Sequence, residues 1–429
     1  MKERIAIIDG LRTPIAKAGG KLKKIQAESL GAHIVQELVL RVGIPYSDYD
    51  EVIMGNVSQP GHAANVARVI ALKAGFPDST IAYTVHRNCA SGMESITSGA
   101  EKIAAGTGEI YLCGGVESMS NIPLLFGKDM RMFFEQLFAS KTIGQRLAVL
   151  SHFRPKHLKP VIGLMQGLTD PISGMLMGST AEILAQDFGI NREEQDEFAL
   201  NSHLKAEEAR AKGIFAQEIA PIIYDASRGK IMEHDDGIRE GQSMQALGKL
   251  RPFFDKKNGT VTAGNSSQIS DAAGAVVLMS ESKAKEMGLE PLGFLRDFAY
   301  AGLDPKRMGL GPIYATSKLF NQNKMNLKDI ELIELNEAFA VQVMANQKAF
   351  ASKQYAKEHL GRSSALGEID ENILNVNGGG VALGHPVGMT GTRLVIHTLK
   401  ELRRQNKQTG LATLCIGGGQ GASLLLEVV

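Results

Sequence analysis

The fold is decided around one stretch, NCASGME at residues 88–94, because a strand pattern precedes it and a helix pattern follows it. Residues 81–85 are apolar, β-branched and aromatic, which predicts a strand. Residues 95–105 are rich in Ala, Ser, Gly and Ile, which predicts a helix. Cys89 is therefore expected at a helix N-terminus, where free N–H groups and the helix dipole favour a thiolate. Because free cysteines are more often inert and buried, this position alone does not establish a reactive residue.

Strand and helix patterns alternate on both sides of this stretch. Strands are predicted at residues 5–9, 51–55 and 109–115, and helices at residues 29–42 and 65–75. Strands that alternate with helices predict a largely parallel sheet covered by helices on both faces.

The C-terminal third repeats this pattern. Its predicted strands are residues 291–298, 329–335, 410–419 and 422–428, and its predicted helices are residues 337–350 and 390–403. The two parts match best where LCGG at 112–115 is compared with LCIGG at 414–418. Two such halves would pack their sheets together, and ligands bind at the carboxyl ends of strands in sheets of this kind. Cys89, His385 and Cys415 all lie at such ends.

The composition indicates a globular protein of two or three domains, or one large duplicated domain. The chain has 429 residues, of which 44% are hydrophobic and 22% charged, and its net charge of +1 argues against a nucleic-acid binder held by a basic field. Three cysteines without metal spacing predict neither a disulfide framework nor a metal site. We expect a reducing, cytoplasmic location without a signal peptide, because MKER precedes the first strand directly, and without a spanning helix.

The middle of the chain, residues 118–250, breaks the alternation, with helices predicted at residues 180–188 and 192–212. Residues 128–159 carry seven basic side chains against two acidic ones. Within this segment one helical face is apolar, made of Met130, Phe133, Phe134, Leu137 and Phe138. Two interpretations stay open: a helical hairpin folded onto its own domain, or a basic amphipathic surface for a membrane face or a partner subunit.

Four further motifs complete the pattern: NEAF at 336–339, GHP at 384–386, CIGGG at 415–419 and the stretch around Cys89. With RTP at 12–14, VESM at 116–119 and TAGN at 262–265, the chain resembles the thiolases from end to end, the family that cleaves or forms 3-ketoacyl-CoA. The resemblance implies an α/β thiolase fold, a duplicated five-layer αβαβα core with an inserted helical loop domain. Its N-terminal half would be residues 1–118, completed by about 251–285, its inserted loop domain for CoA and acyl binding 119–250, and its C-terminal half 286–429.

The residues in these motifs suit such a reaction. Cleavage of a 3-ketoacyl thioester needs a soft nucleophile, a base, an acid for the departing enolate and donors for two oxyanions. Cys89 can form an acyl-enzyme, and His385, which titrates near neutrality, can take its proton. Cys415 can carry a proton to and from the α-carbon, and the glycines after it let N–H groups approach a carbonyl oxygen.

The resemblance implies further roles. The N–H groups of Cys89 and Gly417 would hold the acyl-enzyme oxyanion, and His385 would also donate to the thioester oxygen of the second substrate. Asn336 would hold a water at this second oxyanion hole, and we expect it also to cap the following helix. Contacts to CoA or the acyl chain would come from Ala263, Ser267, Met177 and Phe339. No metal and no tightly bound cofactor is expected, with CoA as co-substrate.

Two other residues invite a role but are assigned none. His86 lies three residues before Cys89, but it belongs to the incoming strand segment. Cys113 has no motif around it, and we expect a small buried strand residue.

The subtype signals conflict. Residues 124–174, with TIGQRL at 142–147, resemble β-subunits of fatty-acid oxidation complexes, which accept medium and long chains and contact membrane or a hydratase/dehydrogenase α-subunit. Those subunits usually have His at the position of Asn336, and Asn336 and GGGVAL at 378–383 resemble soluble thiolases instead. Leu176 stands where short-chain enzymes usually have His, which favours a broad apolar pocket.

We therefore expect an acetyl-CoA C-acyltransferase (3-ketoacyl-CoA thiolase) of fatty-acid β-oxidation that works through acyl-Cys89. The alternative in the same family is an acetoacetyl-CoA thiolase, and the alternative in another class is a scaffolding or membrane-anchoring subunit. The resemblance also implies a homodimer or homotetramer, paired through the N-terminal halves.

Overall fold

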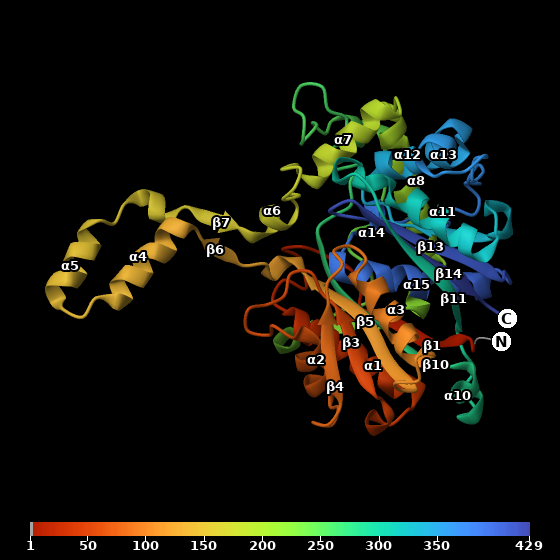
Figure 1. The fold of residues 1–429 in the computed structure, drawn as a ribbon, viewed down its shortest axis with the longest axis horizontal. Coiled ribbons are helices and arrows are strands. Elements are labelled where there is room, and N and C mark those ends of the chain that lie inside the picture. Colours follow the sequence, from red (N-terminus) through yellow and green to blue (C-terminus); the bar gives the residue numbers. More distant parts are fainter. Residues whose placement is uncertain (1–2) are drawn as a thin grey trace.

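The computed structural model describes residues 3–429, and a single ten-stranded sheet runs through its body (Figure 1). The strands of this sheet are β1 (Ile5–Arg12), β2 (Ala16–Lys17), β3 (Glu51–Gly55), β4 (Ile81–Val85), β5 (Ile110–Ser118), β10 (Ser270–Ser280), β11 (Gly293–Gly302), β12 (Leu332–Leu335), β13 (Thr409–Ile416) and β14 (Gln420–Glu427). Two small two-stranded sheets are formed by β6 (Leu124–Phe126) with β7 (Pro160–Ile162) and by β8 (Ile222–Asp225) with β9 (Lys230–Met232).

Some of the α-helices pack against this sheet, whereas others pack on neighbouring helices or belong to a protruding segment. They are α1 (Ala27–Val42), α2 (Val66–Ala74), α3 (Ser91–Ala104), α4 (Lys128–Ala139), α5 (Ile143–Ser151), α6 (Gly163–Gly167), α7 (Met177–Asp187), α8 (Arg192–Ala211), α9 (Met244–Gly248), α10 (Glu281–Glu286), α11 (Gly311–Asn323), α12 (Ala340–Ala351), α13 (Lys353–His359), α14 (Gly380–Leu383) and α15 (Val387–Arg404). Among the helices of residues 3–429, none is both long and apolar enough to cross a membrane.

The strand order confirms the predicted duplication. The N-terminal half runs β4-β3-β5-β10-β1, and the C-terminal half runs β12-β13-β14-β11, extended beyond β12 by a parallel bridge between Ile333 and Leu374. Apart from the two-residue β2, which pairs with β10, the strand that comes first in each half lies at the junction, and the next strand along the chain lies next to the outer end. The halves join where β1 pairs antiparallel with β11, with Ile5 opposite Leu295.

The expectation of a largely parallel sheet is wrong. Only β3 with its neighbours β4 and β5, and β12 with β13, are parallel. The pairings that involve β1, β2, β10, β11 and β14 are antiparallel. The reason is local in one case, because β13 and β14 are joined by a short turn at residues 417–419, whereas parallel neighbours need a long crossover. The other case is β10, which returns to the sheet after the inserted middle segment and runs antiparallel to β5.

The predicted alignment of the two halves at Cys113 and Cys415 is also wrong. Cys113 packs in the cluster that contains α3, whereas Cys415 packs in the cluster that contains α12. Because successive strand residues point to opposite faces, these two cysteines cannot be equivalent. A true match is Asp9 with Asp297, since each accepts the N–H of the next residue (2.7 and 2.9 Å) at a strand irregularity.

Three apolar clusters define five layers. One lies between the N-terminal half-sheet and α1 and α2, and another between the C-terminal half-sheet and α11 and α12. The third joins α3 and α15 to inward-facing residues of both half-sheets, such as Tyr111 and Leu414. The order helix, sheet, helix, sheet, helix is the predicted αβαβα core, and α3 and α15 form its middle layer.

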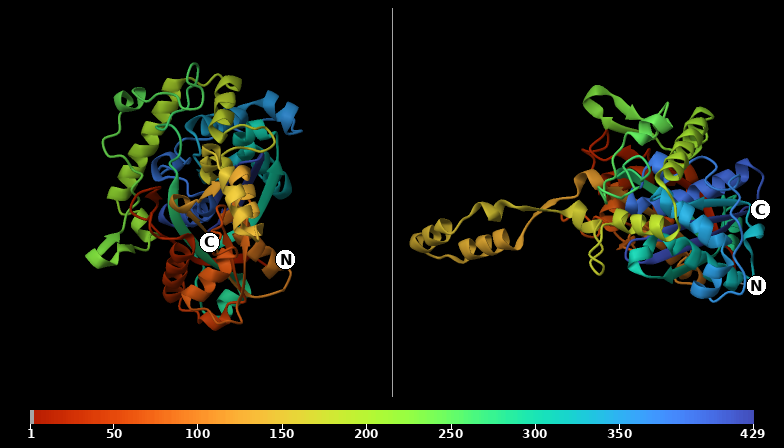
Figure 2. Two further views of the ribbon diagram at one scale, coloured as in Figure 1. Left: turned by 90° about the vertical axis from the view of Figure 1, so that its left-hand side faces the viewer. Right: turned by 90° about the horizontal axis from the view of Figure 1, so that it is seen from above.

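Residues 124–162, hereafter the arm, extend far from this body (Figures 1 and 2). They comprise β6, α4, α5 and β7, and the two strands form the ribbon that leads outward, with Leu124 opposite Ile162. Met130 and Phe133 are buried inside the arm, where Phe133 packs against Phe153 at 5.4 Å between ring centroids. The interpretation of a hairpin folded onto its own domain is therefore wrong, because the arm packs on itself.

Several element boundaries differ from the prediction for identifiable reasons. Helix α3 begins at Ser91, directly after the cysteine loop, rather than at residue 95. Helix α12 begins at Ala340 with Phe339 as its N-cap residue, so Asn336 does not cap it. Strand β12 begins at Leu332, because residues 327–329 form a turn of 3-10 helix.

Candidate active site

Cys89 lies in the loop between β4 and α3, as predicted, and this loop is tied to the C-terminal half. Asn88 has a left-handed backbone conformation with a φ of 43°, which asparagine tolerates better than most residues. Its side-chain amide donates to the carbonyl oxygen of Gly417 at 2.7 Å. The nucleophile candidate is thus held against the glycine loop that follows β13.

The surroundings of the Cys89 thiol favour the protonated form. Burial raises its pKa, the N–H groups of Gly417 and of Cys89 itself oppose this effect, and the Glu117 carboxylate adds to it. The N–H groups act in the predicted direction, toward the thiolate, but burial outweighs them. The thiol therefore needs a base before it can attack.

Cys415 is fully buried, and charge on Cys89 reaches it. Burial raises the pKa of its thiol, and charge on Cys89 raises it further. Cys415 is therefore a neutral thiol that can give up a proton only to a strong base such as an enolate and can take it back.

His385 is held in one tautomer. Its Nδ1 lies 2.6 Å from Thr390 Oγ1, and the Thr390 hydroxyl donates its proton to the carbonyl oxygen of Pro386 at 3.0 Å. Since that hydroxyl has no second proton, Nδ1 must be the donor, and Nε2 carries the free lone pair. Nε2 is buried and forms no hydrogen bond with the protein. Burial and the nearby Arg393 charge lower the pKa of His385 to about 3, so the ring is a neutral base.

Close contact between α3 and α15 brings the Cys89 and His385 loops together. Gly92 and Gly388 stand three residues after Cys89 and His385, respectively. A Cβ on Gly92 would lie 3.1 Å from the Gly388 carbonyl oxygen and 2.6 Å from Thr392 Oγ1, so only glycine permits this approach. Nearly three hundred residues of chain therefore separate two loops that the fold places side by side.

The predicted CoA-contacting segment lies between the Asn336 loop and His385. The N–H of Ser267 donates to Ala338 O, and the N–H of His385 donates to Gln268 O, both at 2.9 Å. Ala263 is exposed and Ser267 is half-buried at the edge of this segment. Asn336 has a buried carboxamide, and neither its oxygen nor its nitrogen is hydrogen-bonded within the protein.

An apolar wall adjoins the glycine loop. The sulfur of Met177 lies 3.2 Å from where a Cβ of Gly417 would be. Met177, Phe339 and Cys415 belong to one apolar cluster, which also contains Phe254. The rings of Phe254 and Phe339 meet edge to face at 6.3 Å. Phe254 was not predicted, although the aromatic pair at 253–254, upstream of TAGN, was a usable signal.

The two residues that were assigned no role lie outside this arrangement. His86 is exposed, and Cys113 is a fully buried strand residue that packs near Gly99 of α3. Residues 3–429 hold no group of three or more His, Cys, Asp or Glu side chains placed to bind a metal ion.

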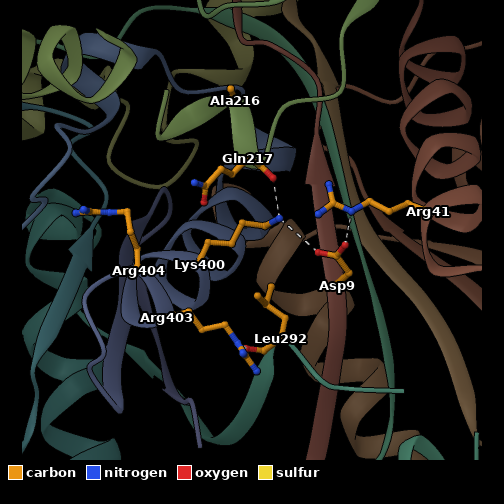
Figure 3. Close-up of a pocket in the computed structure, with 8 residues that line it drawn as sticks. All are labelled: Asp9, Arg41, Ala216, Gln217, Leu292, Lys400, Arg403 and Arg404. Carbon is orange, nitrogen blue, oxygen red and sulfur yellow. Dashed lines mark hydrogen bonds and ion pairs between the residues drawn. The ribbon is translucent and has the colours of Figure 1, made fainter. Parts of the chain in front are cut away.

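A cavity of about 580 Å³ lies at the other end of α15, and its basic side chains are already engaged (Figure 3). Lys400 donates to Gln217 O at 2.9 Å and faces Asp9, which also pairs with Arg41 at 2.7 Å. Arg403 donates to the carbonyl oxygens of residues 291 and 292. These contacts connect α1, β1 and α15, and we assign the cavity no catalytic part.

Comparison with known proteins matches both halves of the chain. Residues 5–282 match the family model "Thiolase, N-terminal domain", and residues 289–428 match "Thiolase, C-terminal domain". The 3-ketoacyl-CoA thiolase of Yersinia enterocolitica is 41% identical over 427 residues, 99% of this chain and 97% of that protein. That of Photorhabdus laumondii is 42% identical with the same coverage.

Solved structures agree in fold over the full length. The acetyl-CoA acetyltransferase of Bacillus anthracis superposes with a TM-score of 0.88 at 38% identity, covering 100% of this chain and 99% of that chain. The human mitochondrial 3-ketoacyl-CoA thiolase in complex with CoA superposes with a TM-score of 0.86 at 33% identity, covering 100% and 98%. The duplicated five-layer fold with paired cysteine and histidine loops is that of a thiolytic acyltransferase. The chain belongs to the thiolase family.

Proposed function

We propose that this protein is a 3-ketoacyl-CoA thiolase, which cleaves 3-ketoacyl-CoA with CoA to give acetyl-CoA and an acyl-CoA two carbons shorter, as in β-oxidation of fatty acids. The observation that carries the proposal is the paired loops at the α3 and α15 N-termini. One presents Cys89 and the other a neutral His385 whose Nε2 is free. CoA is the co-substrate.

The first half-reaction transfers an acyl group to the enzyme. His385 Nε2 takes the proton of Cys89, and Sγ attacks the 3-keto carbon. The bond between the 2- and 3-carbons breaks, its electron pair becomes the enolate of acetyl-CoA, and Cys415 protonates that enolate. In the second half-reaction the CoA thiol gives its proton to the Cys415 thiolate and attacks the acyl thioester, and Cys89 leaves and takes back the proton held by His385 Nε2. Both steps are reversible.

Two oxyanion sites follow from the same loops. The N–H groups of Cys89 and Gly417, both of which lower the pKa of the Cys89 thiol, would stabilise the oxygen of the tetrahedral adduct, and each such donor lowers a barrier by about 3 kcal/mol. We assign the second site to His385 together with a water held by Asn336. The unpartnered buried carboxamide of Asn336 supports this assignment.

Binding of the CoA arm and acyl chain is assigned to the loops around these two sites. Ser267 and Ala263 would meet the pantetheine, and Met177 and Phe339 the acyl group. The chain division we propose is an N-terminal half of residues 1–118 with about 251–285, a loop domain of 119–250 and a C-terminal half of 286–429.

Acetoacetyl-CoA thiolysis is the second candidate. The similarity to the acetyl-CoA acetyltransferase of Bacillus anthracis favours it, whereas the identity of 41–42% to the 3-ketoacyl-CoA thiolases favours longer substrates. The apolar wall of Met177, Phe254 and Phe339 suits an alkyl chain.

Thiolysis kinetics with 3-ketoacyl-CoA substrates of about 4 to 16 carbons, from short to long chains, test the proposal. We expect kcat/KM to rise with chain length beyond acetoacetyl-CoA. A maximum at acetoacetyl-CoA would establish the second candidate. No thiolysis of any chain length by folded protein would leave a scaffolding or anchoring subunit.

We further propose that the arm meets an anionic membrane face, which would make the protein cytoplasmic with peripheral membrane contact. Its tip exposes apolar side chains, among them Phe138 (82%) and Ile143 (78%). Of the seven basic residues in 128–159, only Arg131 and Lys156 pair with carboxylates, at 3.4 and 3.2 Å. Exposed apolar and unneutralised basic groups together suit a lipid interface.

Flotation with vesicles containing anionic lipid tests the arm. The variant Lys128→Glu, Lys141→Glu, Arg146→Glu is expected to lose most flotation. The control variant reverses three exposed lysines on the body, Lys21, Lys23 and Lys24, and is expected to float like the wild type. Equal flotation of all three proteins, or no flotation of any, would exclude the arm as a membrane contact. Capture of a hydratase/dehydrogenase subunit by the wild type alone would then assign the arm to that partner.

A further inference from the structure

Glu117 is a buried charge that the reaction scheme does not use. It stands near the end of β5, its side chain is fully buried, and no basic side chain within residues 3–429 forms an ion pair with it. A buried carboxylate without a cation is costly unless its oxygens accept several hydrogen bonds. A buried carboxylate of this kind therefore needs a structural or functional explanation.

The hydrogen bonds of Glu117 join three segments. Oε1 accepts from Ser58 N at 3.0 Å and from the Asn56 side-chain amide at 3.2 Å. Oε2 accepts from Val57 N at 3.1 Å and from Gly388 N at 2.9 Å. The carboxylate therefore ties the loop after β3 and the end of β5, both in the N-terminal half, to the first turn of α15 in the C-terminal half.

The bond to Gly388 replaces a missing helix cap. The N-cap residue of α15 is Pro386, which forms no side-chain cap, so the first N–H groups of this 18-residue helix depend on outside acceptors. Glu117 supplies one and places a negative charge at the positive end of the helix. Space is tight there, since a Cβ on Gly388 would lie 2.9 Å from Glu117 Oε2 and 2.7 Å from Val116 O.

The Glu117 carboxylate also affects the Cys89 thiol. Glu117, from β5, raises the pKa of the Cys89 thiol, and Cys89 in turn raises the pKa of Cys415, from β13. Glu117 thus contacts the helix that follows His385 and acts through space on Cys89, without contacting the reacting atoms.

We propose that Glu117 is a positioning residue that fixes the first turn of α15, and with it His385, against the Cys89 loop. Burial raises the pKa of Glu117 to about 7, against the N–H groups of Ser58, Gly388 and Val57 that hold its charged form. The inference rests on the proposed function for its kinetic part, whereas its effect on Cys89 chemistry does not require turnover.

Two variants separate the tether from the charge. Glu117→Asp keeps the charge but shortens the reach to Gly388, and Glu117→Gln keeps the size but places an amide NH₂ against N–H donors. The matched control is Glu51→Gln, which removes another buried carboxylate of the N-terminal half, one that pairs with Lys102 at 2.9 Å and has no bond to α15. Folding of each variant is checked by circular dichroism.

Two readouts test the proposal: thiolysis kinetics and the pH dependence of Cys89 alkylation by iodoacetamide, followed on the Cys89 peptide by mass spectrometry. Both Glu117 variants should lower kcat about ten- to a hundredfold while KM changes little, because misplaced reacting groups slow the chemical step. Glu117→Gln should also move the alkylation midpoint to lower pH, whereas Glu117→Asp and Glu51→Gln should leave it unchanged.

Wild-type kcat in a folded Glu117 variant would overturn the positioning role. An unchanged alkylation midpoint in Glu117→Gln would overturn the effect on Cys89. If Glu117→Gln does not fold, the kinetics of Glu117→Asp decide. If the wild type shows no thiolysis, the proposed function fails, and the alkylation midpoints still decide whether Glu117 governs Cys89.

Discussion

Two glutamates that face α15 differ in what they contact. Glu218 accepts from Arg12 Nε at 2.7 Å and from His397 Nδ1 at 2.9 Å. Burial alone would raise its pKa, but the charges of His397 and Arg12 outweigh burial and lower the pKa to about 2. Glu334 accepts no hydrogen bond, and Arg393 and His397 lie 3.9 Å away. Burial therefore raises its pKa to about 7, against the opposing charges of these two residues.

This difference predicts how stability changes with pH. Between pH 4.5 and 7 the folded protein holds a proton on Glu334 that the unfolded chain does not, so this group contributes less to the free energy of unfolding as pH rises through that window. Glu334→Gln removes the effect. We expect its unfolding free energy, relative to wild type, to increase by on the order of 1 to 3 kcal/mol between pH 5 and pH 8.

Thermal unfolding at several pH values measures this change. The control is Glu371→Gln, at an exposed position, which should show no such trend. A difference between Glu334→Gln and wild type that is constant with pH would contradict the assignment, whatever its absolute size.

At the scale of elements, the contact of α3 with α15 sets the active-site geometry. Both helices lie in the middle layer, and Gly92 and Gly391 allow their N-terminal turns to touch, since a Cβ on Gly391 would lie 2.6 Å from Met93 N. The small residues that follow Cys89 are explained by this contact rather than by the chemistry.

Gly92→Ala should separate the two helices. The new methyl group would lie 2.7 Å from Thr392 N, a backbone atom that cannot turn away. Overpacking of this kind costs about 1–3 kcal/mol, and we also expect a lower kcat because His385 moves relative to Cys89. Calorimetry and thiolysis measure both effects, with Gly61→Ala as the control, because nothing lies within 4 Å of a Cβ there. Equal behaviour of the two variants would show that the contact is not limiting.

Local signals in the sequence predicted some elements to the residue and not others. The strands at 51–55 and 81–85 were predicted with their observed bounds, because apolar runs end at a glycine or a polar loop. The direction of β10 and β14 was not predictable from such signals, since it depends on how distant segments return to the sheet. The packing of the arm was not predictable for a similar reason, because amphipathic periodicity shows which helical face is buried but not what that face packs against.

The candidate site was predicted as residues but not as geometry. Cys89, His385 and Cys415 stand in distinctive motifs, and the structure brings their loops together. The tautomer of His385 depends on Thr390, and the cap of α15 depends on Glu117, which lies 271 residues away from its partner. These are tertiary contacts between ordinary residue types, so no local pattern reveals them.

At the scale of the whole molecule, the sheet ends in an open edge at β4. Within residues 3–429 this strand pairs only with β3, and Ile81 is 61% exposed on it. Exposed edge strands pair readily with another chain unless they are protected. We propose that two copies of the chain associate along β4, next to the Cys89 loop.

Light scattering on the eluting protein tests this association. We expect the wild type at twice the chain mass of 46.1 kDa or more, and Ile81→Lys nearer to a single chain, because a charge at a buried edge opposes pairing. Leu40→Lys replaces another exposed apolar residue, on α1 (72% exposed), and should keep the wild-type mass. An unchanged mass in Ile81→Lys would move the interface elsewhere.

The proposed mechanism depends most on Cys89 as the residue that carries the acyl group. The direct measurement is the mass of protein mixed with 3-ketoacyl-CoA in the absence of CoA, quenched in acid and mapped by peptide. We predict an added acyl group, two carbons shorter than that of the substrate, on the Cys89 peptide, with none on folded Cys89→Ser. An unmodified Cys89 in folded wild-type protein, or an adduct on another residue, would contradict the mechanism.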